Sequence, residues 1–221
     1  MDLIAWGGRA APVERRAAVG GKGKRLFDVV AGGLLLMAAL PAMALVALAI
    51  KLTDRGPVLY RHERIGLNGS RFSCLKFRTM VPDAETSFEG LLRRNPEFGN
   101  EWRRGHKLRA DPRITPLGRL LRRWSLDELP QLFNVVRGEM SLVGPRPVTA
   151  AELVRYGASA TAYCRARPGL TGLWQVSGRT RLDYEARIGC DLAYLSAWSP
   201  WLDAVLLART PAAIISGDGA V

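Results

Sequence analysis

The uncharged stretch VVAGGLLLMAALPAMALVALAI, residues 29–50, decides how the rest of the chain is organised. A straight helix of this length is roughly 33 Å long at about 1.5 Å per residue, enough to cross a bilayer core of about 30 Å. Buried helices of soluble proteins rarely stay uncharged for so long, and the apolar part of a signal peptide usually spans only about 7–15 residues. The stretch is therefore predicted to be a membrane helix.

Two features favour a helix that re-enters the same leaflet over one that spans the bilayer. Pro41 lies near the middle of the stretch, where it removes a helix hydrogen bond and kinks the helix. Cationic residues flank the stretch on both sides: Arg9, Arg15, Arg16, Lys22, Lys24 and Arg25 before it, and Lys51, Arg55, Arg61 and Arg64 after it. Because Lys and Arg are retained on the cytoplasmic side, both ends are expected there. A spanning helix is the alternative.

The membrane helix divides the chain into three parts. Residues 1–21, rich in Ala, Gly and Arg, are expected to form a flexible basic arm, and residues 22–52 the re-entrant helix. Residues 53–221 would form one domain on the cytoplasmic face of the membrane. Its amphipathic segment 198–215 begins with two tryptophans, so it either lies on the membrane surface or packs in the core. The expected fold class is α+β, mostly helical, with a small β-hairpin and an N-terminal re-entrant membrane helix.

A β-hairpin is predicted directly after the membrane helix. Two strand-like segments, VLYRHERIG (58–66) and RFSCLKFRTM (71–80), flank an Asn68-Gly69 turn signal. Lys76 and Arg78 are two residues apart, so their cations share one face of the second strand; a solvated strand face explains them equally well. Helices are expected at 85–94, 149–157 and 183–197, and a short helix or turn at 117–124.

The charge balance limits the classes of partner. Lys and Arg outnumber Asp and Glu by 32 to 20, which gives a net charge of +12 and a pI near 10.4. Such a chain favours anionic lipid, a phosphorylated substrate or nucleic acid. Nucleic acid is disfavoured because interleaved aromatics and a recognition motif are absent. The sequence also has no phosphate-binding P-loop, no dinucleotide fingerprint and only two histidines, so serine–histidine hydrolysis and zinc catalysis are poor candidates.

Two adjacent acids, Asp127 and Glu128, stand in SLDELPQLFNVV (125–136), just before apolar residues at helical spacing. Ser125 and Glu128 match a capping box, which would make both acids helix-start residues. Pro130 makes that box awkward, because it would be the fifth helical residue and proline fits only the first turn. The helix is therefore predicted to begin at Asp127 or Glu128, with the dyad at its positive end. Simple capping stays open beside catalysis.

Several arginines lie close to this dyad in sequence, and stiff segments hold one of them and a further arginine later in the chain. A helix N-terminus attracts phosphate, and Arg122, Arg123, Arg137 and Arg146 are near it. Carboxylates beside cations at such a site indicate a divalent metal, a nucleophile or both. Arg146 lies between two prolines in GPRP (144–147), and Arg179 ends the glycine-punctuated loop RPGLTGLWQVSGR (167–179).

The ordered set of motifs resembles the bacterial sugar transferase family, the monotopic phosphoglycosyl transferases that begin exopolysaccharide, O-antigen or glycoprotein glycan assembly. The resemblance covers residues from Lys24 to the C-terminus. Its motifs appear in this order: KRLFD, GPVLYRHERIGLNG, KFRTM, DPRITPLGRLLRRWSLDELPQLFNVVRGEMSLVGPRP, RPGLTGLWQVSGR and DLAYL. Each fragment alone is weak, but the ordered set is very specific.

The resemblance implies transfer of a sugar phosphate from a UDP-sugar to a membrane polyprenol phosphate, such as undecaprenyl phosphate, with release of UMP and a requirement for Mg²⁺. It implies that Asp127 is the nucleophile, forms a covalent phosphosugar intermediate and serves as the metal ligand. Glu128 would position groups or handle a proton. The family's cationic positions, which would bind phosphate or carboxylate groups, correspond to Lys76, Arg122, Arg146 and Arg179.

Two departures from the family pattern matter. Members with a re-entrant helix often have Ser-Pro at its break, whereas this chain has Leu40-Pro41 and lacks the hydroxyl that could satisfy a freed carbonyl. Larger members carry several further membrane helices, so this chain is expected to be the compact form.

The remaining expectations concern substrate and partners. The transferred sugar is expected to be a hexose, galactose or glucose, and an N-acetylated sugar stays open. The expected partners are the UDP-sugar, polyprenol phosphate and membrane lipid, with no nucleic acid; a homodimer is compatible with the sequence. The expected location is the bacterial inner membrane, with the catalytic domain on the cytoplasmic face. The alternative function is a non-enzymatic, basic membrane adaptor of a polysaccharide assembly complex.

Overall fold

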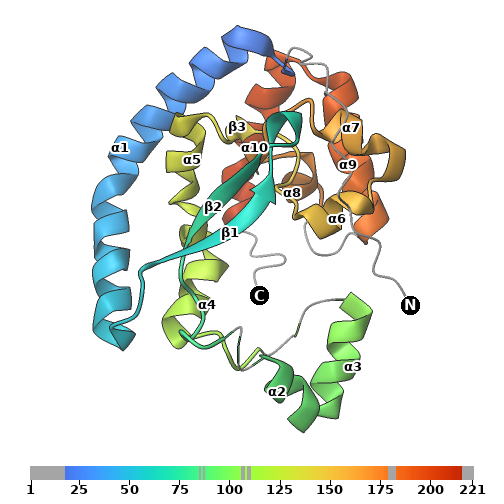
Figure 1. Ribbon diagram of the computed structural model, residues 1–221. Helices are drawn as coiled ribbons and strands as arrows, with labels where there is room; N and C mark the ends of the chain where they lie inside the picture. The colour runs from blue at the N-terminus through green and yellow to red at the C-terminus, as the bar shows by residue number, and fades with distance from the viewer. Residues whose placement is uncertain are drawn as a thin grey trace.

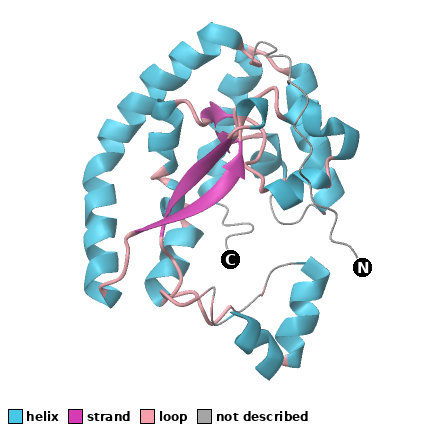
Figure 2. Ribbon diagram, viewed as in Figure 1, coloured by secondary structure: helices cyan, strands magenta, loops and turns pink. Residues whose placement is uncertain are grey.

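The computed structural model describes residues 18–84, 86, 88–105, 108, 111–178 and 183–215. Most of the expected basic arm therefore lies outside the described residues. The α-helices are α1 Gly21–Asp54, α2 Phe88–Arg94, α3 Pro96–Gly105, α4 Pro116–Arg123, α5 Gln131–Arg137, α6 Ala150–Val154, α7 Ala160–Tyr163, α8 Leu173–Ser177, α9 Tyr184–Ala197 and α10 Pro200–Ile215. The strands are β1 Leu59–Ile65, β2 Arg71–Phe77, β3 Ser141–Val143 and β4 Gly169–Thr171, and 3₁₀ turns cover Leu67–Gly69, Leu126–Glu128 and Gly157–Ser159. Helices predominate and the strands are few and short, as expected (Figure 2).

The helix α1 contains the whole predicted membrane stretch. It bends along one side of the molecule (Figure 1) but runs without interruption through Pro41. Among the described residues it is the one helix long and apolar enough to cross a membrane. Pro41 therefore does not end this helix, because one missing hydrogen bond leaves the neighbouring turns intact.

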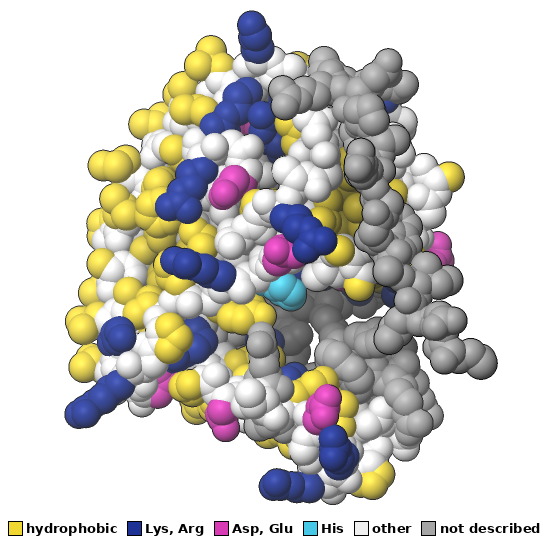
Figure 3. Space-filling model, in the orientation of Figure 1, with side chains coloured by type: hydrophobic (Ala, Val, Ile, Leu, Met, Phe, Trp, Pro, Cys, Tyr) yellow, Lys and Arg dark blue, Asp and Glu magenta, His cyan; other side chains and the backbone are white. Residues whose placement is uncertain are grey.

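One narrow line of α1 faces the protein, and the opposite face is apolar and exposed. The buried positions, Asp28, Gly32, Met43 and Ile50, extend over most of the helix length. On the outer face, Leu45 is 70% exposed and Leu52 is 79% exposed. Hydrophobic side chains gather along the left edge of Figure 3, the side on which α1 lies in Figure 1. An apolar surface of this extent is typical of a membrane contact.

The predicted hairpin is confirmed. Strands β1 and β2 pair antiparallel, with Leu59 opposite Phe77 and Ile65 opposite Arg71. Asn68 and Gly69 turn the chain with φ of 57° and 73°, the left-handed conformation that Asn and Gly tolerate best. A second, parallel pair joins β3 to β4.

A buried asparagine fixes α5 against the hairpin. The Asn134 side chain accepts a hydrogen bond from the Leu75 N–H at 3.0 Å and donates one to the Ser73 carbonyl at 2.8 Å. It therefore satisfies the backbone of β2 on the side away from β1. The same helix packs on α1, where a side chain in place of Gly32 would come within 2.9 Å of Val135. These contacts set the position of the segment just before α5.

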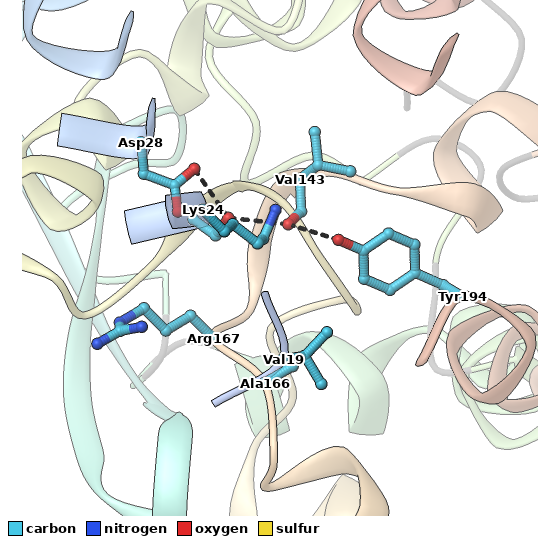
Figure 4. A pocket seen from close by; sticks show the side chains of 8 residues that line it. Val19, Lys24, Asp28, Val143, Ala166, Arg167 and Tyr194 are labelled. Atoms are coloured by element: carbon cyan, nitrogen blue, oxygen red, sulfur yellow. Dashed lines mark hydrogen bonds between the residues drawn. The ribbon is translucent and has the colours of Figure 1, made fainter. Parts of the chain in front are cut away.

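The KRLFD motif clamps the start of α1 to the rest of the protein. Lys24 donates to Asp203 of α10 at 2.5 Å, and Arg25 donates to the Val135 carbonyl at the end of α5 at 2.7 Å. Asp28 accepts hydrogen bonds from the Ser141 hydroxyl and the Leu142 N–H, both at 3.0 Å. A small cavity of about 10 Å³ lies beside this cluster (Figure 4).

The helix α10 packs in the core on one face and leaves a tryptophan exposed on another. Asp203 and Leu206 are buried, so one face of α10 packs in the core. Trp201 on another face is 77% exposed. Core packing therefore accounts for the inward face of this helix.

The other helix predictions differ from the structure mainly at their ends. α2 begins at Phe88 and α6 ends at Val154, both inside the predicted ranges. α9 matches its prediction closely because Asp183 caps it, accepting from the Ala186 N–H at 2.7 Å.

Candidate active site

A cavity of about 800 Å³ lies between the β1–β2 hairpin, the 3₁₀ turn Leu126–Glu128 and the loop before α6. Five of the six predicted catalytic and substrate-binding residues line it: Lys76, Arg122, Asp127, Glu128 and Arg146. The sixth, Arg179, lies outside the described residues. Pro41, predicted as the break in the membrane helix, is part of α1 and does not line the cavity.

The acidic dyad is placed by a 3₁₀ turn, which corrects the predicted helix start. Ser125 has φ 53° and makes no side-chain cap, so the capping box is not formed. Asp127 and Glu128 lie in the turn Leu126–Glu128, and the helix α5 begins only at Gln131, with Pro130 as its N-cap. The predicted start at Asp127 or Glu128 is therefore wrong by three to four residues. Proline, which lacks an N–H, fits the position just outside the helix.

Asp127 is nearly buried, with 9% of its surface exposed. Burial raises the pKa of this carboxyl group, and the adjacent Glu128 raises it further, while Lys76 and Arg122 oppose the rise. A poorly hydrated carboxylate held between cations is well placed to attack an electrophilic phosphorus.

Glu128 is held by a lysine from the hairpin. Lys76 Nζ donates to Glu128 Oε1 at 2.7 Å. Burial lowers the pKa of Lys76, but Glu128 and Asp127 more than offset this, so the net shift is upward and the ammonium stays charged. The predicted Lys76 is therefore part of the same cluster as the dyad.

Arg122 reaches the cavity from the last turn of α4. Its Nε donates to the Thr79 hydroxyl at 2.9 Å, and its charge acts on Asp127. Thr115 caps the start of α4, and Gly118 brings this helix against the hairpin, since an added Cβ there would lie 2.0 Å from the Thr79 carbonyl oxygen. Thr79 is a site residue that the sequence analysis missed, although it belongs to the KFRTM motif.

Arg146 has the rigid mount that its flanking prolines predicted. Its N–H donates to Asp191 at 3.1 Å, and its carbonyl accepts from the Tyr163 hydroxyl at 2.9 Å. Asp191 also accepts from the Tyr156 hydroxyl at 2.7 Å. Burial raises the pKa of Asp191 to about 6. This buried aspartate, from the DLAYL motif, thus holds the backbone of Arg146 in place.

The loop GPRP (144–147) packs directly on the glycine-punctuated loop that begins at Arg167. Their glycines allow the close approach: a Cβ on Gly169 would lie 2.1 Å from the Gly144 nitrogen, and one on Gly172 would lie 2.1 Å from the Gly144 oxygen. Two segments that are separate in sequence therefore form one wall of the cavity.

The cavity contains more cations than the sequence analysis assigned to it. Its described lining residues include seven cationic side chains and two carboxylates. Those missed from the sequence are Arg64, Arg78, Arg113 and Arg187. Arg78 pairs with Asp54 at the end of α1 and occupies the space where a side chain on Gly56 would lie. Arg78 was predicted only to share a strand face with Lys76, and nothing in the spacing of Arg64, Arg113 and Arg187 distinguishes them from the other arginines of a basic chain.

The donor groups of the site fit a magnesium ion that is bound together with a substrate. Within the described ranges, no group of three or more His, Cys, Asp or Glu side chains could hold a metal ion by itself. Mg²⁺, however, is usually held by one or two carboxylates and by substrate phosphates. Asp127 and Glu128 offer that number of carboxylates inside a cationic cavity.

Comparison with known proteins agrees with this geometry. Residues 20–217 match the family model described as "Bacterial sugar transferase". The chain belongs to the bacterial sugar transferase family. This membership confirms the resemblance drawn from the motifs and the prediction that the protein is an enzyme.

Relatives of this sugar transferase include an exopolysaccharide production protein and two undecaprenyl-phosphate sugar transferases. It is 47% identical to the exopolysaccharide production protein ExoY of Rhizobium meliloti, over 91% of this chain and 89% of that protein. It is 46% identical to the undecaprenyl-phosphate galactose phosphotransferase of Salmonella typhimurium, over 89% of this chain but only 41% of that protein. It is 42% identical to the UDP-glucose:undecaprenyl-phosphate glucose-1-phosphate transferase of Caulobacter vibrioides, over 89% and 71% of the two chains.

Proposed function

We propose that this sugar transferase moves a sugar 1-phosphate from a UDP-sugar to undecaprenyl phosphate and releases UMP. The observation that carries the proposal is the nearly buried Asp127, held beside Glu128, Lys76 and Arg122 in a strongly cationic cavity. The names of the Salmonella and Caulobacter relatives support undecaprenyl phosphate as the acceptor and galactose or glucose as the sugar. This reaction would be the first membrane step of exopolysaccharide or related glycan synthesis.

In the first step the Asp127 carboxylate oxygen attacks the β-phosphorus of the UDP-sugar. A carboxylate–phosphorus bond forms as the bond from that phosphorus to the bridging oxygen breaks, and UMP leaves with the electron pair. The sugar phosphate is then linked to Asp127. Lys76 and Arg122 are close enough to act on the Asp127 charge, and they would stabilise the negative charge on the transferred phosphoryl oxygens.

In the second step a phosphate oxygen of undecaprenyl phosphate attacks the same phosphorus. The Asp127–phosphorus bond breaks, the carboxylate is restored, and the product is a sugar linked to undecaprenyl diphosphate. Two steps allow a water-soluble donor and a lipid acceptor to use one nucleophile in turn. Glu128, hydrogen-bonded to Lys76, would keep the ammonium in place through both steps.

Mg²⁺ belongs to this proposal as the cofactor. Asp127, with Glu128 beside it, would hold the ion jointly with the diphosphate of the donor. When bound, the ion would neutralise phosphate charge. The predicted Arg179 would add a further phosphate contact.

The packing of α1 supports the proposal that it is re-entrant. Its buried positions run from Asp28 to Ile50, so the polar domain lies alongside most of the helix. A perpendicular, spanning orientation would draw that domain into the hydrocarbon region. We therefore place both ends of α1 on the cytoplasmic face of the inner membrane.

Labelling from one side tests this orientation. In a variant without Cys74, Cys164 and Cys190, single cysteines would replace Lys22 and Thr53 at the two ends of α1. Both should react with an impermeant maleimide in sealed inside-out vesicles. Labelling of only one of them would show that α1 spans the membrane.

Activity is tested with Asp127→Asn, a panel of UDP-sugars and undecaprenyl phosphate. UMP release and a phosphosugar adduct on Asp127, detected by mass spectrometry, are expected only with the wild-type carboxylate. The exposed Asp83→Asn is the matched control and should retain activity. Wild-type rates of UMP release by Asp127→Asn would refute the mechanism. Salt-sensitive lipid binding without any UMP release would instead support a membrane adaptor.

A further inference from the structure

The cavity extends beyond Asp127 to a wall where two arginines contact one tryptophan. The guanidinium carbon of Arg146 lies 5.1 Å from the ring centroid of Trp174, and that of Arg187 lies 5.5 Å from it. The three side chains come from the loop before α6, from α8 and from α9, and all three line the cavity. An indole ring holds guanidinium groups by attraction between the cations and the ring electrons.

The carboxylates near the cavity are already paired with other cations. The described pairs are Lys76 with Glu128, Arg78 with Asp54, Arg113 with Asp111, and Arg64 with Glu152. Arg146 lies 3.7 Å from Glu152, the carboxylate that Arg64 contacts at 2.7 Å. Among the described lining residues cations outnumber carboxylates by seven to two, and the wall formed by Arg146 and Arg187 contributes two of these cations.

The two arginines of this wall also act on each other. Burial lowers the pKa of Arg187, and the nearby charge of Arg146 lowers it further, while Tyr184, Glu152 and Asp183 oppose the fall. An anion bound between the two guanidinium groups would reduce their mutual repulsion. A phosphate group suits such a pair best, because guanidinium forks match its oxygen geometry.

The position of this wall favours the nucleotide over the lipid as its ligand. α8 and α9 lie on the opposite side of the hairpin from α1 (Figure 1). The lipid acceptor would reach the cavity from the α1 side, where Pro57 and Leu59 contribute to the lining. The soluble donor would then fill the side formed by α8 and α9. There the indole of Trp174 and the guanidinium groups that lie over it would contact the base of the donor.

We propose that Arg146, Trp174 and Arg187 form the nucleoside monophosphate subsite of this enzyme. The subsite binds the α-phosphate and base of the donor and holds UMP after its bond to the β-phosphate breaks. The inference deepens the proposed function and rests on it for the identity of the donor. It adds Arg187 and Trp174 to the substrate-binding residues.

Equilibrium binding of UMP to the full-length protein in detergent tests the subsite without turnover. Arg187→Met is expected to weaken UMP binding by about tenfold, the loss typical of one charged hydrogen-bonding partner. Arg155→Met is the matched control. Arg155 also stacks on an aromatic ring, that of Tyr184 on α9, at 3.6 Å, but it does not line the cavity. Its UMP affinity should equal that of the wild type.

Two further variants separate phosphate binding from base binding. Arg187→Lys keeps the charge and should retain part of the affinity, which guards against misfolding of Arg187→Met as the explanation. Trp174→Leu should weaken UMP binding but leave the affinity for ribose 5-phosphate, which has no base, nearly unchanged. In turnover, Arg187→Met should raise the KM for the UDP-sugar and leave the KM for undecaprenyl phosphate unchanged.

The outcomes distinguish this inference from the proposed reaction. Equal UMP affinity in Arg187→Met and the wild type, or an equal loss in Arg155→Met, would overturn the subsite. A change confined to the KM for undecaprenyl phosphate would also overturn it. If the wild type binds UMP through Arg187 but releases no UMP from any UDP-sugar, the subsite stands and the proposed reaction fails.

Discussion

Two buried polar clusters of this protein both place an aspartate close to a lysine, but one stabilises the fold and the other has the features of a reactive site. At the start of α1, Asp203 accepts hydrogen bonds from Lys24 at 2.5 Å, Tyr194 at 2.7 Å and Trp198 at 3.1 Å. In the cavity, Asp127 lies beside a second carboxylate, and burial and that neighbour raise its pKa. The first cluster matches each charge with donors and holds α1 in place. The second keeps a carboxylate in an unfavourable setting, as expected of a reactive group.

Among the substitutions considered, neutralising Asp127 is expected to change the activity most. Asp127→Asn should reduce UMP release on the order of 10⁴-fold, since removal of a nucleophile abolishes the covalent route. Its thermal unfolding temperature in detergent should stay equal to or above that of the wild type, because the change removes a crowded buried charge. A clear loss of stability would show that the dyad also serves the fold.

The Lys24–Asp203 ion pair should instead affect stability. Asp203→Ala leaves the Lys24 ammonium buried without its carboxylate, and breaking such a pair costs about 3–5 kcal/mol of the free energy of unfolding. Denaturant unfolding in detergent measures this loss. The exposed Asp183→Ala, which removes only a helix cap, should cost about 1 kcal/mol. If both variants lose the same free energy of unfolding, the Lys24–Asp203 ion pair contributes no more than a helix cap.

Asp191, which accepts a hydrogen bond from the backbone of Arg146, gives the stability of the protein a dependence on pH. Its folded-state pKa of about 6 is above the ordinary aspartate value of 3.8, so the folded protein binds more protons than the unfolded chain between these pH values. Its contribution to stability therefore falls as the pH rises from about 4 to about 6, by up to about 3 kcal/mol. Asp191→Asn does not titrate. Its free energy of unfolding should improve relative to wild type over that pH range, and a constant difference would contradict the shift.

The smallest expected effect concerns the contact between α1 and α5. Gly32→Ala places a methyl group about 2.9 Å from Val135 Cγ1, so the helices must separate slightly. Overpacking of this kind costs about 1–3 kcal/mol. Gly33→Ala is the matched control, because a Cβ there meets nothing within 4 Å and should slightly stabilise the helix. Equal unfolding temperatures for both variants would show that α1 packs less tightly than described.

Local sequence signals were sufficient to predict the long apolar helix, the β-hairpin and most of the candidate site residues. The length and apolarity of residues 29–50 predicted α1, and Asn68-Gly69 predicted the hairpin, because both signals depend on neighbouring residues alone. The ordered motifs identified the family and selected Asp127, Glu128, Lys76, Arg122 and Arg146, which the fold brings to one cavity.

The tertiary structure decided the features that depend on distant residues. The dyad lies in a 3₁₀ turn, since Asn134 anchors α5 to the hairpin and Pro130 occupies the position before the helix. Arg187 and Trp174 join Arg146 only because separate segments of the chain fold against one another. In a basic sequence, nothing next to an arginine indicates which residue or ligand it contacts. Which arginines face the substrate is set by packing between residues far apart in the chain, and the sequence alone does not show it.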